Sequence, residues 1–388
     1  MLHDTILLNV LRYIQKQHLS QVSLRFYTLY FESLHHTSQQ IILHQNPDLD
    51  VYPSLSFLPQ YRPLFHLVVD ITIGEGYHPD LSLFPSLKSL NVYDSSSLYQ
   101  LLPTLPPSVT NLSIMDDFDE DVSSYRLPNI TTFSLCFGCL QILNLFAFSN
   151  LSSLSLYDVT LAGDADNIDS DLVFPSVRTL SMDKCRFPHF VLYYFINISK
   201  LLLGPRTDFY QIQCFSSLKE VSVQSVVDCN YLYSLRKLTL DFDFNNPILV
   251  DNFSCNNLTF LKVSGLVKFN TENLISVKHL KIVLNHQSNS FFSLTEFLCG
   301  ATLPLLSCVD ISLNVECTSQ LSVDLEEFQS VKTVIVNSNS KCTLECTFKN
   351  CQNVKYLILK GANELADSEV LRQLFPNLEY RKVLTLDT

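Results

Sequence analysis

The sequence is poor in glycine and in positive charge, and both deficits exclude classes of function. Eight glycines in 388 residues leave little material for the glycine-rich loops that cradle phosphates, and no His-Glu-x-x-His, Gly-x-Ser-x-Gly or Gly-x-x-x-x-Gly-Lys sequence occurs. Lys and Arg number 26 against 38 Asp and Glu, whereas nucleic-acid binding requires a surplus of positive charge. We therefore expect no enzyme, no cofactor and no nucleic-acid partner.

Long apolar runs are also missing. A membrane-spanning helix needs about 18 or more consecutive apolar residues, and the densest run, Phe190–Ile198, is much shorter. The first five residues carry Asp4 where a signal peptide carries Lys or Arg. We therefore expect a cytoplasmic or nuclear protein, or one found in both compartments, with no membrane partner.

Cysteine is common, but its spacing does not predict a metal site. Cys136 and Cys139 form a Cys-x-x-Cys pair, yet a zinc site normally needs a second pair, or two histidines, at matching spacing. In a reducing compartment such cysteines behave as small buried apolar residues. The acidic run at residues 116–121 lacks calcium-loop spacing. We expect no bound metal.

The most informative positive feature is a repeated phrase, Leu-x-x-Leu-x-Leu, in which Val, Ile, Phe and Met also fill the apolar positions. Its copies recur about every 22 residues, which is within the range of leucine-rich repeats. The last Leu-x-Leu of each copy has the period of a strand, and Pro, Ser, Asn or Asp residues bound it. The copies begin at Leu64, Leu87, Val109, Ile130, Leu151, Val177, Ile198, Leu218, Leu235, Leu258, Val277, Leu306, Val331, Val354 and Leu378.

This pattern resembles the leucine-rich-repeat family over residues 46–388, an array of about 15 repeats. The resemblance implies an α/β fold, a curved solenoid with one parallel sheet on its concave side. On the convex side the clearest predicted helices are Phe291–Cys299 and Asp367–Leu374. The family usually has Asn or Cys three residues after the third apolar position, and only some copies of this chain do, at Cys185, Asn285, Asn314 and Asn339.

A different pattern occupies residues 1–45. Apolar residues at helical spacing predict two amphipathic helices, and Gln40–Leu43 predicts a first strand that leads into the array. The run Val22-Ser23-Leu24-Arg25-Phe26-Tyr27 resembles part of the F-box, the motif that attaches substrate receptors to the Skp adaptor of cullin-RING ubiquitin ligases. The resemblance implies adaptor docking, and through it a cullin, by Leu2, Ile6, Leu7, Leu11, Val22 and Phe26. The alternative is a helical cap on the open end of the solenoid.

The x positions of the repeat should project from the concave face. In the first half they are mainly small and polar, as in Ser89, Asn91, Thr132 and Ser155. In the second half they turn basic, which predicts a protein partner with an acidic or phosphorylated segment. The alternative is that lysine is simply common on a solvated strand face. The basic residues are Lys219, Arg236, Lys237, Lys262, Lys278, Lys281, Lys332 and Lys355.

Together these features predict a substrate-recognition subunit of a Skp-cullin-F-box ubiquitin ligase. The repeats would hold the target, and other subunits would carry the chemistry. The alternative is a leucine-rich-repeat scaffold or adaptor that binds proteins without ubiquitin transfer.

Overall fold

The structure is a computed structural model that describes part of the chain, between residues 40 and 384. The six residues of the F-box resemblance lie outside that part. No helix within it is long and apolar enough to cross a membrane. The described ranges are 40–43, 69–73, 78, 80–93, 95–116, 118, 122–162, 173–187, 193–204, 215–224, 232–242, 248–251, 256–265, 267–270, 274–286, 291–298, 303–315, 319–338, 344–360 and 372–384.

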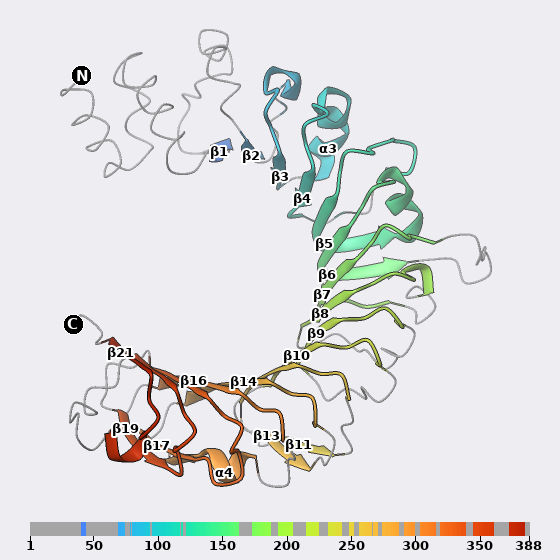
Figure 1. Cartoon of the computed structure of the whole chain (residues 1–388). Helices are drawn as coiled ribbons and strands as arrows, with labels where there is room; N and C mark the ends of the chain where they lie inside the picture. Colours follow the sequence, from blue (N-terminus) through green and yellow to red (C-terminus); the bar gives the residue numbers. More distant parts are fainter. Residues whose placement is uncertain are drawn as a thin grey trace, which may run out of the picture. The chain divides into compact units, whose positions relative to one another are not determined.

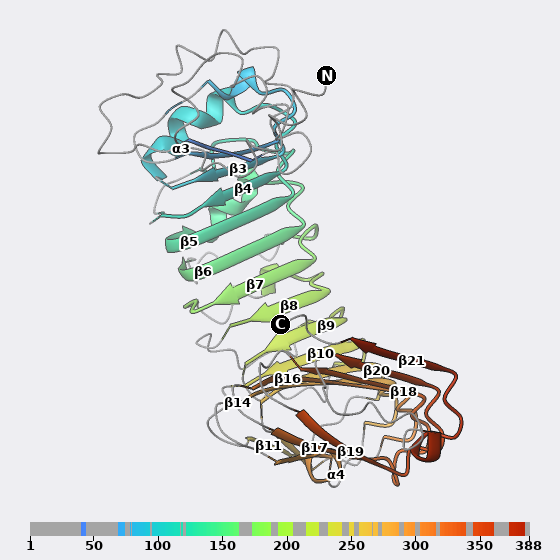
Figure 2. The ribbon, with the colours of Figure 1, turned by 90° about the vertical axis from the view of Figure 1, so that its left-hand side faces the viewer.

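The chain forms two compact units. Unit 1 comprises Met1–Val177 and Met182–Val191, and unit 2 comprises Arg178–Ser181 and Leu192–Thr388. Strand β7 (Thr179–Asp183) therefore contributes to both. In unit 1, consecutive strands pair in parallel as successive rungs (Figure 2). They are β1 (Gln40–Leu43), β2 (Asp70–Ile73), β3 (Ser89–Val92), β4 (Asn111–Ile114), β5 (Thr132–Gln141) and β6 (Ser153–Ala162).

Unit 2 continues the same construction with a longer row of strands, again one from each copy of the repeat. The pairs with a described register are all parallel. In order along the row, the strands are β8 (Lys200–Leu203), β9 (Glu220–Val223), β10 (Lys237–Asp241), β12 (Phe260–Ser264), β14 (His279–His286), β16 (Cys308–Val315), β18 (Thr333–Ser338), β20 (Tyr356–Lys360) and β21 (Tyr380–Leu384).

The repeat phrase explains these rows. Its second and third apolar residues alternate along the strands and are buried, as are Leu90 and Val92 in β3, except in the last copy, where Arg381 takes the second position and is exposed. The register stacks them on the matching residues of the next copy, so that Leu90 lies opposite Leu112. Each copy alone would expose this apolar surface, and stacking buries it continuously. The structure thus confirms the predicted parallel solenoid.

The first copy is shifted from its predicted position. The sequence phrase begins at Leu64, but β2 starts at Asp70 and buries Ile71 and Ile73. Those two residues lie opposite Leu90 and Val92 of β3. The segment from Leu64 to Ile73 carries overlapping apolar patterns, and only pairing with β3 selects between them. The predicted first strand at Gln40–Leu43 is confirmed as β1, paired with β2.

A tight turn precedes the strands, and asparagine connects successive turns. In the turn before β3, the Leu87 N–H donates to the Phe84 carbonyl at 3.1 Å. Asn150 Nδ2 donates to the Pro128 carbonyl at 2.8 Å, and Asn257 Nδ2 to the Tyr233 carbonyl at 2.7 Å. These asparagine side chains form a row of hydrogen bonds from one turn to the next, which we call the turn ladder. In these copies the turn ladder lies before the strand. At the family's usual place after the strand, Cys185 Sγ lies 3.4 Å from the Leu156 carbonyl oxygen.

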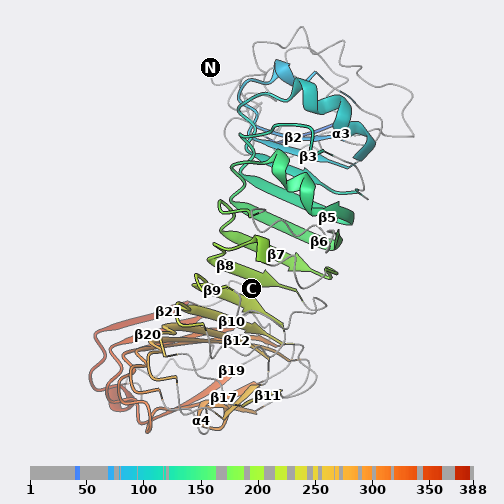
Figure 3. The ribbon, with the colours of Figure 1, turned by 90° about the vertical axis from the view of Figure 1, so that its right-hand side faces the viewer.

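The side opposite the strand rows differs between the units. In unit 1 it carries the helix α3 (Ser95–Leu101), which packs beside β3 (Figure 3), and the 3-10 helices η3 (Leu81–Leu83), η4 (Leu102–Thr104) and η5 (Ile142–Ala147). In unit 2 it carries two small parallel sheets and the helix α4 (Leu294–Phe297) (Figure 1). The sheets are β11 (Ile248–Asp251) with β13 (Val267–Asn270), and β15 (Phe291–Ser293), β17 (Ser319–Asp324) and β19 (Leu344–Lys349).

The helix predicted at Phe291–Cys299 is therefore only partly correct. Phe291–Ser293 is strand β15, paired with β17, and the helix is limited to Leu294–Phe297. Pairing with β17 supplies hydrogen bonds that a local helical pattern does not anticipate. Of the helix predicted at Asp367–Leu374, residues 372–374 are described and are helical.

Candidate functional site: the strand face of unit 2

The eight predicted basic residues all lie in unit 2, but they divide between two surfaces. We call the outward-facing side chains of the strand row the strand face, and the first x residue of each copy, just before each strand, the leading edge. Lys237, Lys262 and Lys281 belong to the strand face. The leading edge carries Lys219, Arg236, Lys278, Lys332 and Lys355.

Leading-edge residues hold the sheet through their backbone. The carbonyl of Lys332, for example, accepts the N–H groups of Lys355 and Tyr356 at 2.8 and 3.0 Å. Their side chains take no part in these backbone hydrogen bonds. Those of Lys278 and Lys332 are exposed to solvent, and that of Lys355 is half-buried. The leading edge is therefore a row of regularly spaced side chains on a fixed backbone.

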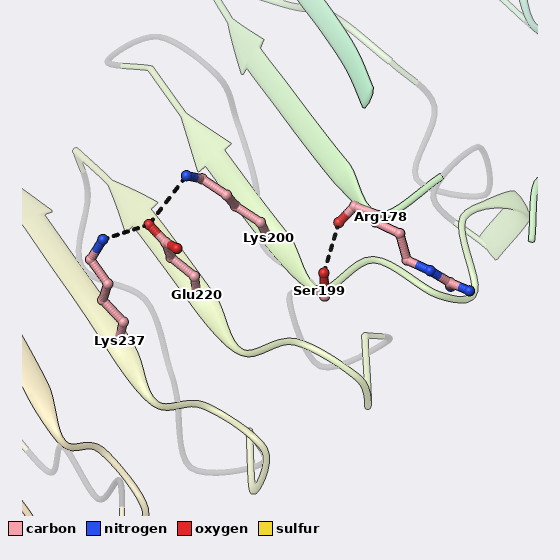
Figure 4. A network of polar contacts seen from close by, with 5 residues as sticks. All are labelled: Arg178, Ser199, Lys200, Glu220 and Lys237. Carbon is pink, nitrogen blue, oxygen red and sulfur yellow. Dashed lines mark hydrogen bonds and ion pairs between the residues drawn. The ribbon is translucent and has the colours of Figure 1, made fainter. Parts of the chain in front are cut away.

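On the strand face, a carboxylate between two lysines neutralises part of the predicted positive charge. Lys200 from β8 and Lys237 from β10 converge on Glu220 of β9, with Nζ to Oε1 distances of 3.3 and 2.9 Å (Figure 4). Burial alone would raise the pKa of Glu220, but the Lys237 hydrogen bond and both lysine charges outweigh it and lower that pKa. Glu220 is therefore held ionised.

A second carboxylate occupies the strand face further along the row. Asp310 of β16 is only 7% exposed. It accepts hydrogen bonds from Lys281 Nζ at 2.9 Å and from Asn337 Nδ2 at 3.0 Å. Burial of a carboxylate is tolerated here because both of its oxygens are hydrogen-bonded.

Aromatic rings lie between these two networks. The Phe260 ring has Lys237 Nζ at 5.5 Å on one side and the His279 ring at 4.9 Å on the other. Burial lowers the pKa of His279; Asp310 opposes this effect and Lys281 reinforces it. His279 Nε2 is buried with no hydrogen-bond partner among the described residues. Lys262 adjoins this group on β12, and within the described part of the chain it forms no ion pair.

The last strands of the row carry exposed apolar side chains. Tyr356 and Tyr380 are 42% and 47% exposed, and Ile335 and Ile358 lie half-buried on the same face. Reading the x positions for basic residues alone missed these side chains, and it missed the acids that pair with the lysines. The signal was present, because Glu220, Asp310 and Tyr356 all occupy x positions of the phrase.

In unit 1, the outward-facing residues of β3 to β6 are mainly small and polar, as the sequence predicts, but Phe137 of β5 is 44% exposed and its ring lies 5.7 Å from that of Tyr157 of β6. Asn91 Nδ2 donates to Asp70 Oδ1 at 3.0 Å and to Thr72 Oγ1 at 3.3 Å. Cys136 and Cys139 both lie half-buried on β5. Across the described ranges of the chain, no group of three or more His, Cys, Asp or Glu residues is arranged to hold a metal ion.

Comparison with known proteins supports the fold and does not indicate a function. No protein family and no curated protein matches the sequence. Among solved structures, the crystal structure of the mouse RP105/MD-1 complex is similar with a TM-score of 0.50 and 15% identity, covering 82% of this chain and 63% of that one. The crystal structure of the TLR13–ssRNA13 complex has a TM-score of 0.49 and 16% identity, covering 83% and 56%.

Both matched chains are leucine-rich-repeat proteins. At 15% identity, the likeness to the RP105/MD-1 structure shows the solenoid fold alone. This chain spans less than two thirds of the length of either one.

Proposed function

We propose that the chain is a non-catalytic leucine-rich-repeat protein that binds another protein on the strand face of unit 2. The carrying observation is the composition of that face: exposed tyrosines and lysines project from a sheet whose backbone is already fixed. Tyrosine and other aromatic residues are enriched at the centres of protein interfaces, with charged groups at the rim. A preformed surface also loses little conformational entropy on binding.

The more specific proposal is a substrate receptor of a Skp-cullin-F-box ubiquitin ligase, acting in the cytoplasm, the nucleus or both. Its support is the F-box resemblance of residues 1–45 followed by a repeat array. Leu2, Ile6, Leu7, Leu11, Val22 and Phe26 would dock the Skp adaptor, and the strand face would hold the target. The alternative is a scaffold with the same binding face and no link to ubiquitin transfer.

Deleting residues 1–45 separates these two alternatives. The full chain should recover the Skp adaptor and its cullin in a pull-down, and the deleted chain should lose both. A variant with Lys262→Glu should recover the adaptor as well as the unchanged chain does. Equal recovery of adaptor with and without residues 1–45 would overturn the ubiquitin-ligase proposal.

The strand-face proposal needs its own variant. Charge reversal at Lys237 or Lys281 also breaks the pairs with Glu220 and Asp310, so Lys262→Glu is the cleaner change. It should weaken binding of an acidic partner by about threefold to tenfold. Lys88→Glu, an exposed lysine of unit 1, is the matched control. Equal binding by both variants and the parent chain would count against the strand face.

A further inference from the structure

The last three strands of unit 2 carry a positive charge that the chain as a whole lacks. Residues 329–338, 352–360 and 376–384 contain β18, β20 and β21 with the turns that precede them. Their leading edge and strand face hold four basic residues, Lys332, Lys355, Lys360 and Lys382, against one acidic residue, Glu379, whereas Arg381 lies opposite the buried Leu357 on the other face. The net charge of the chain is −12. A local surface of opposite sign attracts an acidic partner.

A hollow opens at the leading edge of these strands. Its volume is about 480 Å³, and three consecutive copies line it with Gln329, Lys332, Asn353, Lys355, Asn377 and Glu379. The asparagines belong to the turn ladder: Asn353 Nδ2 donates to the Gln329 carbonyl at 2.9 Å, and Asn377 Nδ2 to the Gln352 carbonyl at 2.7 Å. The walls are therefore fixed by the fold, whereas the lysine side chains remain adjustable.

The chain itself shows how a carboxylate is held in this hollow. Glu379, on the leading edge of β21, accepts a hydrogen bond from Lys355 Nζ of the preceding copy. Its other oxygen accepts from the Tyr356 hydroxyl at 3.2 Å. One copy earlier, Lys332 occupies the equivalent position beside Lys355, and among the described residues it forms no ion pair. The hollow has one lysine more than it has acids.

Apolar side chains adjoin the hollow on the strand face. Tyr380 is the cross-strand neighbour of Tyr356, and Ile335 is the neighbour of Ile358. Both tyrosines are more than two-fifths exposed. A partner that reaches the lysines would cover these rings, and burial of aromatic area dominates the energetics of many interfaces.

We infer that this surface docks an acidic protein segment that inserts a carboxylate beside Lys332 and lays an apolar side chain against Tyr356 and Tyr380. This inference rests on the proposed protein-binding function and assigns its partner chemistry. The described residues favour a carboxylate over a phosphate. The hollow already holds one carboxylate, that of Glu379, which Lys355 and Tyr356 engage.

The backbone of the hollow also argues against a phosphate site. The N–H groups of Lys355 and Tyr356 donate to Lys332, and those of Glu379 and Tyr380 donate to Lys355. These groups are therefore committed to the sheet and cannot form the nest of N–H donors that binds phosphate elsewhere.

The first test measures binding of a synthetic probe to the full chain by fluorescence anisotropy. The probe is a labelled peptide in which glutamates flank a Leu-Phe pair. Lys332→Glu should weaken its binding about tenfold, because reversal replaces attraction by repulsion. Lys278→Glu is the matched control, since Lys278 is also an exposed leading-edge lysine of unit 2 and lies outside the hollow. It should change binding less than twofold, and equal effects of the two variants would overturn the inference.

Three further probes test the chemistry of the segment. Replacing the glutamates by glutamine, or the Leu-Phe pair by serine, should each weaken binding about tenfold. Phosphoserine in place of glutamate should give no gain. If the phosphoserine probe binds more than tenfold more tightly than the glutamate probe, the recognised segment is phosphorylated and the inference fails.

The carboxylate of Glu379 provides a test in which binding of the probe should become stronger. Glu379→Gln removes the negative charge that engages Lys355 and should tighten glutamate-probe binding about threefold. Glu345→Gln makes the same change in net charge at an exposed residue of β19, and it should have a much smaller effect. Equal tightening by both would show attraction by overall charge alone and would contradict docking in the hollow.

These outcomes are independent of the tests of the proposed function. If the probe fails to bind but Lys262→Glu weakens the native partner, the docking inference falls and the strand-face proposal stands. If the probe behaves as expected but adaptor recovery does not depend on residues 1–45, the docking inference stands and the ubiquitin-ligase proposal falls.

Discussion

The two units share one buried scaffold and present different surfaces. In unit 1, the outward-facing positions of β3 to β6 are mainly serine, threonine and asparagine, as in Ser134 and Ser155. In unit 2, the same positions carry charged networks around Glu220 and Asp310, and then exposed tyrosines. The buried positions of the phrase scarcely differ: they are Leu, Val and Ile in both units, with Phe133 and Met182 added in unit 1. The repeat therefore constrains the interior and leaves the surface free to vary.

The opposite side of the strand rows also differs. Unit 1 uses α3 and 3-10 helices there, whereas unit 2 adds the short parallel strands β11, β13, β15, β17 and β19. These strands stack copy on copy, as Ser319–Asp324 does on Leu344–Lys349. The copies that contribute these short strands are therefore hydrogen-bonded to their neighbours twice, once in the strand row and once on the opposite side.

The largest expected effect is the stability lost when a buried side chain is truncated. Measured in both units, it tests whether their apolar interiors contribute equally to stability. Phe133 of unit 1 is fully buried and stacks on Phe148 with ring centroids 4.8 Å apart, and Leu261 of unit 2 is 1% exposed. Phe133→Ala should lower the local free energy of unfolding by about 3–5 kcal/mol and Leu261→Ala by about 2–5 kcal/mol. Hydrogen-exchange mass spectrometry on peptides containing β5 and β12 measures each loss. A loss well below about 1 kcal/mol in either unit would break the equivalence.

A smaller effect should separate the two polar faces. Asp310→Ala removes the acceptor of Lys281 and Asn337 and should cost about 1.5–3 kcal/mol, because hydrogen bonds to a charged group are lost. Asn91→Ala removes a single donor to the Asp70 carboxylate of unit 1 and should cost only about 1 kcal/mol, because Asp70 is half-buried and water can replace that donor. Urea denaturation of the two variants compares them. Asp310→Asn, which keeps an acceptor for Asn337, should recover part of the loss, and no recovery would contradict the assigned network.

The smallest effect depends on pH and should appear in unit 2. Burial lowers the pKa of His279, so the unfolded chain binds a proton at this residue more readily than the folded chain does. The neutral ring therefore contributes stability above about pH 6.5. That contribution is lost as the pH falls through the lowered pKa.

His279→Phe keeps an aromatic ring against Phe260 and removes the titration. Between about pH 7.5 and about pH 5.5, the parent chain should lose more stability than this variant does. Thermal denaturation at the two pH values measures the difference, and the remaining nine of ten histidines cancel in the comparison. Identical pH dependence of the two proteins would contradict a buried neutral imidazole at position 279.

The Leu-x-x-Leu-x-Leu phrase predicted the strands of the array well, because burial at a fixed spacing is a local property of the sequence. It failed at the first copy, where Leu64–Ile73 offers overlapping patterns and only the register with β3 distinguishes them. It also failed at Phe291–Ser293, where pairing with β17 overrides a helical pattern. Both errors concern contacts between residues distant in sequence.

The candidate site shows the same division. The lysines at x positions were visible in the sequence as a change in composition. Their partners were not, because Lys200, Glu220 and Lys237 meet only when three copies are stacked in register. The six residues around the hollow are likewise spread over residues 329–379, and no local motif connects them.

The sequence by itself determined that this chain is a solenoid of parallel strands, since a repeated apolar spacing can bury itself only by stacking. It also determined which side chains face outward, because a strand alternates its faces. Only the tertiary structure decided which outward side chains meet. Cross-strand contacts depend on register, and register fixes that Glu220 pairs with two lysines while Lys332 is left beside Lys355 at the edge of an open hollow.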